Sequence, residues 1–177
     1  MPSIVIRPAR EQDAPALLAV YTPYVEQTAV SFELTAPTAD AFRDRVRQTL
    51  TAYPYLVAEE EGRVLGYAYA GRFRPRAAFA CSAEVSIYLS PVCHRRGIGR
   101  RLYAALEDRL RTQGVTNLYA VIAAAAADDP YLPRGSEEFH RAAGYRPVGR
   151  YTGCGCKFGR RYDVVVMEKL LDPPEET

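Results

Sequence analysis

The stretch HRRGIGRR, residues 94–101, places two glycines among four arginines at the start of a predicted helix. A helix N-terminus leaves several backbone N–H groups unpaired and carries about half a positive charge from the helix dipole. Gly97 and Gly99 let the backbone approach a bound group closely. The arginines can add charge-assisted hydrogen bonds. This combination favours binding of an anion such as a diphosphate.

Two common phosphate-binding motifs do not fit this stretch. No Gly-Lys-Ser or Gly-Lys-Thr follows the glycines, which excludes a Walker A loop. The G-x-G-x-x-G spacing of dinucleotide-binding folds fails after Gly99, and no βαβ unit opens the chain. The pattern alone therefore leaves two interpretations open: an anion-binding turn, or a plain helix start with a solvated basic turn.

The composition restricts the class of protein. The chain has 177 residues, of which 48% are hydrophobic and 25% charged, as in a globular domain. We expect one domain over residues 1–171 and a disordered tail over 172–177. The net charge of +2 argues against a general nucleic-acid binder. Because no apolar run reaches the ~20 residues of a membrane span and no leader pattern opens the chain, we expect a cytoplasmic protein without membrane contact.

The four cysteines predict neither a disulfide framework nor a metal site. Cys154 and Cys156 form only a C-x-C pair, and no Cys/His set has the spacing of zinc ligands. Disulfides are unusual in a cytosolic chain of this size. We therefore expect no metal.

Strand and helix patterns surround the glycine turn. Residues 82–90 alternate as a strand, and apolar residues at every fourth position from Ile98 to Leu110 indicate a helix over 97–113. A helix over 136–144 would start with Ser136 as its cap, and Pro23 predicts a kink or break in the helix over 10–28. The remaining predicted elements are strands at 3–9, 117–125, 145–153 and 161–170, a hairpin at 55–73 and a helix at 38–50. The order is βααβββαβαββ, an α+β or mixed α/β layout.

The sequence HRRGIG after SIYLSP resembles the acetyl-CoA loop [QR]-x-x-G-x-[GA] of the GCN5-related N-acetyltransferases (GNATs), with His94 where Gln or Arg is usual. Four further stretches resemble the phosphinothricin and methionine sulfoximine acetyltransferase branch of this family: YPYLVAEEEGRVLGYAYAG, AEVSIYLSP, FHRAAGY and KFGRRYDVVVMEK. The resemblance covers nearly the whole chain. It implies a GNAT fold, with a single, mostly antiparallel sheet of about seven strands flanked by helices.

The resemblance also implies acetyl-CoA as co-substrate and assigns residues to it. The pantetheine arm would lie along the backbone of Ile87, Tyr88 and Leu89. The pyrophosphate would lie on the glycine turn, whose residues are Arg95, Arg96, Gly97, Ile98, Gly99 and Arg100.

Two catalytic candidates follow from the same resemblance. Glu84 matches the presumed catalytic glutamate of the branch and would take the proton that an amine must lose before acetylation. Without the resemblance it reads as a surface carboxylate. His140 matches a histidine near the substrate, although a structural histidine is an equal alternative. Tyr131 and Tyr145 are candidates for reprotonating the thiolate, with no preference between them.

The implied acceptor residues are Phe32, Arg74, Arg76 and Phe79. Arginine suits a carboxylate because its guanidinium can bind both oxygens. The alternatives are a solvated loop for the arginines and a core position for Phe32. One departure from the branch lies at residues 126–135, which replace a short N-x-x-S turn and lack its Asn. Asp128 or Asp129 could take over that role.

We therefore expect an acetyl-CoA-dependent N-acetyltransferase that acts on the amine of a small amino acid or amino-acid analogue. One alternative keeps the cofactor but changes the amine to a polyamine, an antibiotic or a protein N-terminus. Another is a non-catalytic module that binds acyl-CoA. The resemblance also suggests a homodimer.

Overall fold

Seven strands form a single sheet in the computed structural model, which describes residues 3–93 and 96–171. The spatial order is β1-β2-β3-β4-β5-β7-β6. The strands are β1 (Val5–Pro8), β2 (Tyr55–Glu60), β3 (Arg63–Arg72), β4 (Ser82–Leu89), β5 (Asn117–Ala124), β6 (Arg146–Lys157) and β7 (Arg160–Leu170). The helices are α1 (Ala14–Glu26), α2 (Ala39–Leu50), α3 (Ile98–Thr112) and α4 (Ser136–Ala142).

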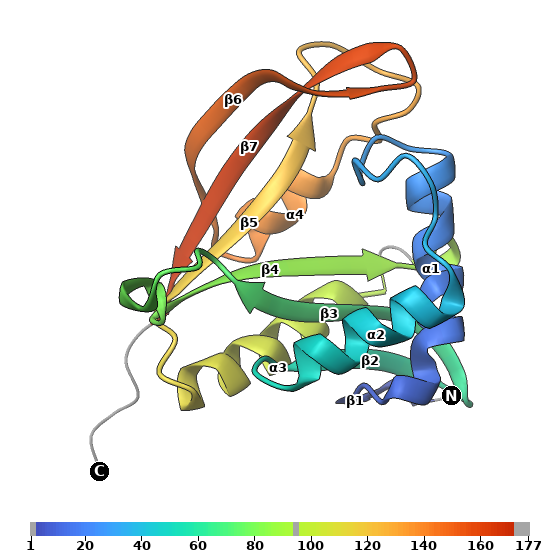
Figure 1. Ribbon diagram of the computed structural model, residues 1–177, viewed down its shortest axis with the longest axis vertical. Coiled ribbons are helices and arrows are strands. Elements are labelled where there is room, and N and C mark those ends of the chain that lie inside the picture. The colour runs from blue at the N-terminus through green and yellow to red at the C-terminus, as the bar shows by residue number, and fades with distance from the viewer. Residues whose placement is uncertain (1–2, 94–95, 172–177) are drawn as a thin grey trace.

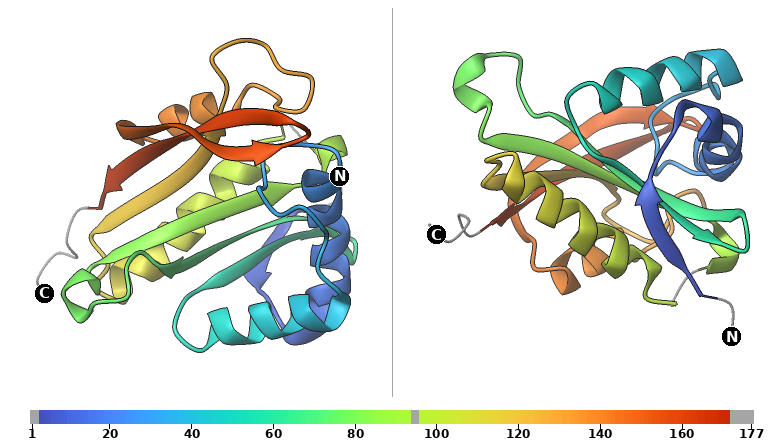
Figure 2. Two further views of the ribbon diagram at one scale, coloured as in Figure 1. Left: turned by 45° about the horizontal axis from the view of Figure 1, so that its top comes forward. Right: turned by 90° about the horizontal axis from the view of Figure 1, so that it is seen from below.

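The predicted element order and fold class are confirmed. All neighbouring strands are antiparallel except β4 and β5, which run parallel. Helices α1 and α2 cover one face of the sheet, while α3 and α4 cover the other (Figures 1 and 2). The apolar stripe of α3 packs on that second face, where Leu102, Leu106 and Leu110 are completely buried.

The parallel pair β4–β5 is short, and this creates the main irregularity of the sheet. Only Ser82, Ala83 and Glu84 pair with β5. Beyond Glu84, β4 stays paired with β3 alone as far as Leu89, and Figure 1 shows β4 and β5 diverging. The sheet therefore divides into two parts that are joined at the start of β4.

Three local features can be compared with their predictions: a hairpin turn, a helix with an internal proline and a helix cap. The predicted hairpin over 55–73 turns at Glu61 and Gly62, both with positive φ, which suits a tight turn between twisted strands. Helix α1 continues through Pro23 to Glu26, so there is no break. Ser136 is the first residue of α4 rather than its cap, because the cap position is taken by Gly135, whose φ is +131°.

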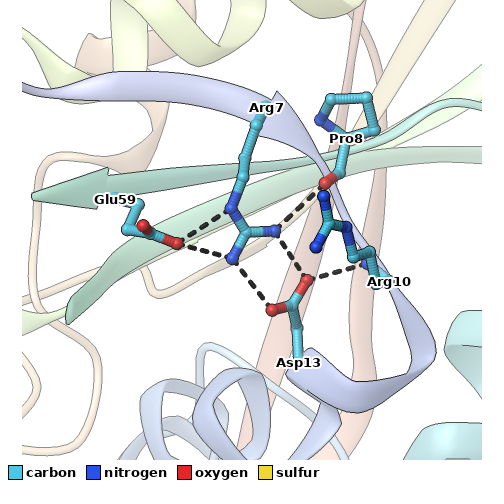
Figure 3. A network of polar contacts seen from close by, with 5 residues as sticks. All are labelled: Arg7, Pro8, Arg10, Asp13 and Glu59. Carbon is cyan, nitrogen blue, oxygen red and sulfur yellow. Dashed lines mark hydrogen bonds and ion pairs between the residues drawn. The ribbon is translucent and has the colours of Figure 1, made fainter. Parts of the chain in front are cut away.

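A polar network ties the first strand to the start of α1 (Figure 3). The guanidinium of Arg7 donates to both carboxylate oxygens of Asp13 at 2.8 and 2.9 Å and to Glu59 of β2 at 2.6 and 2.8 Å. Asp13 also accepts from the backbone N–H of Arg10 at 2.8 Å. The Arg7 hydrogen bond and ion pair lower the pKa of Asp13 despite its burial.

Candidate active site

A cavity of about 70 Å³ lies where β4 and β5 diverge. One wall is Ser86, Ile87 and Tyr88 from β4, and the opposite wall comes from β5 residues 120–123. Tyr103 of α3 and His140 of α4 line it as well. The predicted cofactor strand, β4, therefore has one edge without a hydrogen-bonded neighbour beyond Glu84.

The backbone of this strand is not uniformly available. The carbonyl of Leu89 already accepts a hydrogen bond from the hydroxyl of Tyr24 at 2.5 Å. Ile87 and Leu89 pack their side chains toward the α3 core, while Tyr88 points to the α1 side and contacts Tyr21 and Tyr24. Beyond Glu84, the edge of β4 that faces β5 therefore carries no ladder partner from β5.

The glycine turn leads directly into α3. Gly97 precedes the first helical residue with φ of +72°, a left-handed conformation that favours glycine. A Cβ at Gly99 would lie 2.8 Å from the ring of Phe139, so glycine is required for α4 to approach this closely. Ile98 is buried beneath the turn. The N–H groups that begin α3 thus follow a turn that favours glycine at Gly97 and requires it at Gly99.

The arginines of the turn do not all point to one place. Arg96 forms a two-point ion pair with Glu60 of β2, and Arg101 donates to the carbonyl of Ile4 at 2.7 Å. Arg100 is exposed and makes no ion pair within residues 3–93 and 96–171. Arg95, also predicted to bind the cofactor, lies outside the described residues. Of the described arginines, Arg100 is therefore the one that could turn toward a bound phosphate without losing a partner.

Glu84 stands at the point where the two strands separate. Its neighbours across the sheet are Gly71 of β3 and Tyr119 of β5. The side chain is half-buried, and this burial raises the pKa of Glu84, although the nearby positive charge of Arg74 opposes the shift. A carboxylate with a raised pKa in a partly desolvated position is suited to accept a proton.

Arg74 lies in the connection between β3 and β4, together with the predicted acceptor residues Arg76 and Phe79. Its guanidinium lies 4.9 Å from the ring of Phe73, which stacks on Tyr119 at 4.1 Å. This stack brings Arg74 to the Glu84 side of the sheet. Arg76 and Phe79 are exposed on the same loop, and Phe79 packs its ring edge against Phe73.

His140 is buried, with both ring nitrogens engaged. Nδ1 lies 2.7 Å from the carbonyl of Ser136, which can only accept, so Nδ1 carries the proton. Nε2 therefore accepts from the hydroxyl of Tyr103 at 2.9 Å. Burial lowers the pKa of His140 and keeps the ring neutral. Proton movement involving this histidine would run through Tyr103.

Phe32 lies in the α1–α2 connection, which rests on the β6–β7 hairpin. Its ring fills the space above Gly155, where a Cβ would come within 2.5 Å, and it also approaches Tyr162. The buried ammonium of Lys157 donates to the carbonyls of Val25 and Ser31 at 2.6 Å each. The hairpin thus holds the loop that carries Phe32.

Comparison with known proteins identifies the family. The model of the GNAT acetyltransferase domain matches residues 6–166. The chain belongs to the GNAT acetyltransferases.

Similar proteins come from the branch that the sequence resembles. The phosphinothricin N-acetyltransferase of Alcaligenes faecalis is 35% identical over 97% of this chain and 85% of that protein. The methionine sulfoximine/methionine sulfone acetyltransferase of Pseudomonas aeruginosa is 36% identical over 97% and 96%. A GNAT phosphinothricin acetyltransferase from Sinorhizobium meliloti, solved with acetyl-CoA, is 33% identical with a TM-score of 0.86 and covers 97% of this chain and 94% of its own. The predicted GNAT resemblance is confirmed.

The segment that departs from the branch is anchored to the hairpin. The carboxylate of Asp129 accepts from Tyr162 at 3.1 Å, from Arg160 at 3.0 Å and from the N–H of Tyr131 at 2.9 Å. Asp128 pairs with Arg134 on the surface. Asp129 therefore fixes the segment over residues 126–135 to the hairpin.

Sequence reasoning missed Lys157 and Tyr103. A lysine in a glycine-rich strand reads as solvent-exposed, and its burial depends on a loop more than 120 residues away in the sequence. Tyr103 was one of 13 tyrosines without a distinguishing neighbour. Of the two tyrosines named for the thiolate, Tyr145 is buried in the core and Tyr131 stacks on Phe158 near the hairpin.

Two general expectations concern metals and membranes. Across residues 3–93 and 96–171, no group of three or more His, Cys, Asp or Glu side chains could hold a metal ion. In the same part of the chain no helix is long and apolar enough to cross a membrane.

Proposed function

We propose that this GNAT transfers the acetyl group of acetyl-CoA to the amine of a small amino acid or amino-acid analogue. The observation that carries the proposal is the position of Glu84, a half-buried carboxylate with a raised pKa at the point where β4 and β5 diverge. We further propose that residues 1–171 act as one domain, that the protein works as a homodimer and that it is cytoplasmic.

The residues of the opening fit acetyl-CoA, which supplies the activated acetyl group. The free edge of β4 at Ile87 and Tyr88 suits the amide groups of a pantetheine arm, because it lacks a strand partner. The turn at Gly97, Ile98 and Gly99 presents the unpaired N–H groups of α3 to a diphosphate. Backbone groups of Arg95, Arg96 and Arg100 would complete this turn. The side chain of Arg96 would keep its ion pair with Glu60.

Glu84 would act as the general base. An ammonium group cannot attack a thioester until it has lost a proton, and general-base catalysis of such a step is worth about 10²–10⁴ in rate. Because burial raises the pKa of Glu84, the carboxylate is a stronger base than an exposed glutamate. His140 stays a second candidate, acting through the hydroxyl of Tyr103.

The acceptor class follows from the charges around Glu84. Arg74 and Arg76 suit the carboxylate of an amino acid and repel a polycationic amine. Phe32 and Phe79 would add apolar contacts from the two loops on either side. The names of the relatives from Alcaligenes faecalis and Pseudomonas aeruginosa describe acetylation of amino-acid analogues, which agrees with these charges.

A thiol-release assay tests the proposal. The protein is incubated with acetyl-CoA and, separately, with neutral amino acids, methionine sulfone, phosphinothricin and spermidine. We expect free thiol to appear with the amino acids or their analogues and little with spermidine. Release with spermidine alone would favour the polyamine alternative. Binding of acetyl-CoA without turnover on any amine would favour the non-catalytic module.

A further inference from the structure

Two cysteines lie on the last strand of the sheet, separated by one glycine. Cys154, Gly155 and Cys156 belong to β6, which is last in the spatial order and pairs with β7 (Figure 1). Both cysteines are exposed and free. Side chains alternate along a strand, so the two thiols project to one face, while Phe32 lies on the opposite face above Gly155. Two accessible thiols therefore lie next to each other on the surface.

The other two cysteines of the chain cannot pair with each other. Cys81 is exposed and precedes β4, whereas Cys93 is buried and follows it. The eight residues of β4 separate them by roughly 26 Å, at about 3.3 Å per residue. A disulfide needs Cα atoms no more than about 6.8 Å apart. Cys81 and Cys93 thus provide an internal comparison within the same protein.

The ladder between β6 and β7 is irregular beside the exposed pair. The register shifts between Tyr151 and Gly155, where three residues of β6 lie opposite one residue of β7. Cys154 belongs to this bulge and follows Gly153, whose φ is +57°. Asp163, the single residue opposite, accepts from the N–H of Gly153 at 2.7 Å. Because a bulged strand bends locally and loses ladder hydrogen bonds, this part of β6 has room to change its path.

The spacing of the two thiols suits a strained, easily reduced disulfide. Residues two apart on a strand have Cα atoms about 6.4–6.8 Å apart, twice the rise per residue. Disulfides span about 4.4–6.8 Å and most often about 5.5–6 Å, so bond formation here must shorten β6 slightly. The residue that would bend is Gly155, which has the widest choice of backbone conformations. Strained or exposed disulfides are the labile ones, and disulfides in cytosolic proteins are mostly of this transient kind.

Bending at Gly155 would act on the proposed acceptor site through Phe32. The Phe32 ring lies so close that a Cβ at Gly155 would come within 2.5 Å of it. Lys157, the residue after the pair, is buried and donates to two carbonyls of the α1 end and the following loop at 2.6 Å each. Because β6 is fixed directly after Cys156, a change in its path falls on the surface that supports Phe32.

We propose that Cys154 and Cys156 are a redox modification site, which a peroxide converts to a reversible disulfide that weakens binding of the acceptor. The chemistry at the two thiols is independent of the proposed function. The effect on the acceptor rests on the proposed function, because it acts through Phe32.

The oxidation proceeds in two balanced steps. The sulfur of one cysteine attacks the O–O bond of hydrogen peroxide, that bond breaks, and one water leaves as the sulfur becomes a sulfenic acid. The thiol of the other cysteine then attacks this sulfur, the S–O bond breaks, and a second water leaves with the thiol proton. Two electrons have passed from the two sulfurs to the peroxide. A low-molecular-weight thiol such as glutathione reverses the reaction by two exchange steps and becomes a disulfide itself.

Peptide masses of the unaltered protein test the site without any need for turnover. Trypsin cleaves after Arg150 and Lys157, so both thiols of the pair leave in the peptide 151–157, whereas Cys81 and Cys93 leave in the peptide 77–95. The reduced protein is treated with hydrogen peroxide, and the remaining free thiols are blocked in denaturant. We expect peptide 151–157 to lose two hydrogens and escape blocking, and to regain both thiols after treatment with glutathione.

Peptide 77–95 should carry two blocked thiols throughout. Three outcomes would overturn the proposal: two blocked thiols in peptide 151–157, a disulfide that joins two copies of this peptide, or irreversible oxidation of a single cysteine.

Kinetics before and after oxidation test the effect on the acceptor. Loss of thioester absorbance follows the reaction, because a thiol reagent would also react with the cysteines. For the amino acid that is turned over fastest, we expect oxidation to raise KM about tenfold and reduction to restore it, with the KM of acetyl-CoA within about twofold. An unchanged acceptor KM would overturn the effect on the acceptor. A disulfide in peptide 151–157 without turnover in either state would support the modification site and contradict the proposed function.

Serine variants distinguish the pair from general oxidation. Cys154→Ser and Cys156→Ser each remove one thiol from an exposed position, so the fold should persist. We expect peroxide to leave the acceptor KM of both variants nearly unchanged. Cys81→Ser is the matched control, since Cys81 is exposed outside the pair, and it should respond like the unaltered protein. A full response in either variant of the pair would overturn the proposal.

Discussion

At the scale of single residues, the proposed chemistry depends on the surroundings of one carboxylate. Glu84 is adjacent to β5 only through Tyr119, and beyond it the strands separate. Burial raises the pKa of Glu84 while Arg74 lowers it, so the resulting basicity is a balance between desolvation and a single nearby cation. The pKa of Glu84 should therefore change measurably when either contribution is removed.

Arg74→Gln tests this balance through the pH dependence of turnover. A general base works only when deprotonated, so kcat/KM should fall on the acidic side as pH drops through the raised pKa of Glu84. Removing the Arg74 charge removes the opposing contribution and raises that pKa further, which moves the acidic limb to higher pH. An unmoved or oppositely moved limb would contradict the assignment. Arg63→Gln is the control, since Arg63 is exposed at the distant start of β3.

At the scale of elements, the proposed acceptor side depends on contacts between the α1–α2 connection and the β6–β7 hairpin. Phe32 rests on Gly155, and the buried Lys157 donates to the carbonyls of Val25 at the end of α1 and of Ser31 within the loop. These contacts fix a loop that has no regular structure of its own between Gln27 and Thr38. The position of Phe32 should therefore change when the hairpin surface changes.

Gly155→Ala should displace Phe32. The added methyl group would come within 2.5 Å of the Phe32 ring, and overpacking of this kind costs about 1–3 kcal/mol. We expect a lower free energy of unfolding and a higher KM for the acceptor, with the KM for acetyl-CoA unchanged. Gly149→Ala on the same strand meets nothing within 4 Å and serves as control. Identical behaviour of the two variants would argue against a role of Phe32 at the acceptor site.

Asp13→Asn should weaken the link between β1, β2 and α1. The folded-state pKa of Asp13 is lowered, so its contribution to stability is present above the unfolded pKa of about 3.9 and is lost as pH falls through the folded value. We expect a loss of about 1 kcal/mol at neutral pH, a modest value because the pair is partly solvated.

Thermal unfolding at neutral pH and near pH 2 measures this dependence. The difference between Asp13→Asn and the unaltered protein should shrink at the acidic pH. Asp44→Asn, which breaks the exposed Arg47–Asp44 pair, should have little effect at either pH. A pH-independent difference for Asp13→Asn would show that packing, not charge, carries the contribution.

Sequence patterns predicted elements better than side-chain directions. The apolar stripe of α3 and the glycines before it encode a helix start, because both act through local backbone geometry. The pairing of Arg96 with Glu60, by contrast, depends on two elements 36 positions apart. The ring contacts of Tyr55 with Tyr69 and of Tyr67 with Tyr88 likewise require the registers β2–β3 and β3–β4. Such contacts follow from tertiary structure and leave no periodic signal.

At the scale of the whole molecule, we propose that the diverging sheet gives each substrate its own side. The opening between β4 and β5 lies beside α3 and α4, whose glycine turn suits acetyl-CoA. The α1–α2 side carries the loop with Phe32, which we propose to lie at the acceptor site. Glu84 stands where the two sides meet, at the last residue that pairs with β5.

This arrangement predicts that binding of the cofactor and catalysis can be separated by one substitution. Glu84→Gln keeps the size of the side chain and removes its basicity. Thiol release with the preferred amino acid and calorimetric titration with acetyl-CoA are measured side by side for both proteins, with the exposed Glu26→Gln as control.

We expect a loss of about 10²–10⁴ in kcat for Glu84→Gln, with the Kd for acetyl-CoA within about twofold of the unaltered protein. Turnover within about threefold of the unaltered protein, with a folded variant, would contradict the proposal that Glu84 deprotonates the amine.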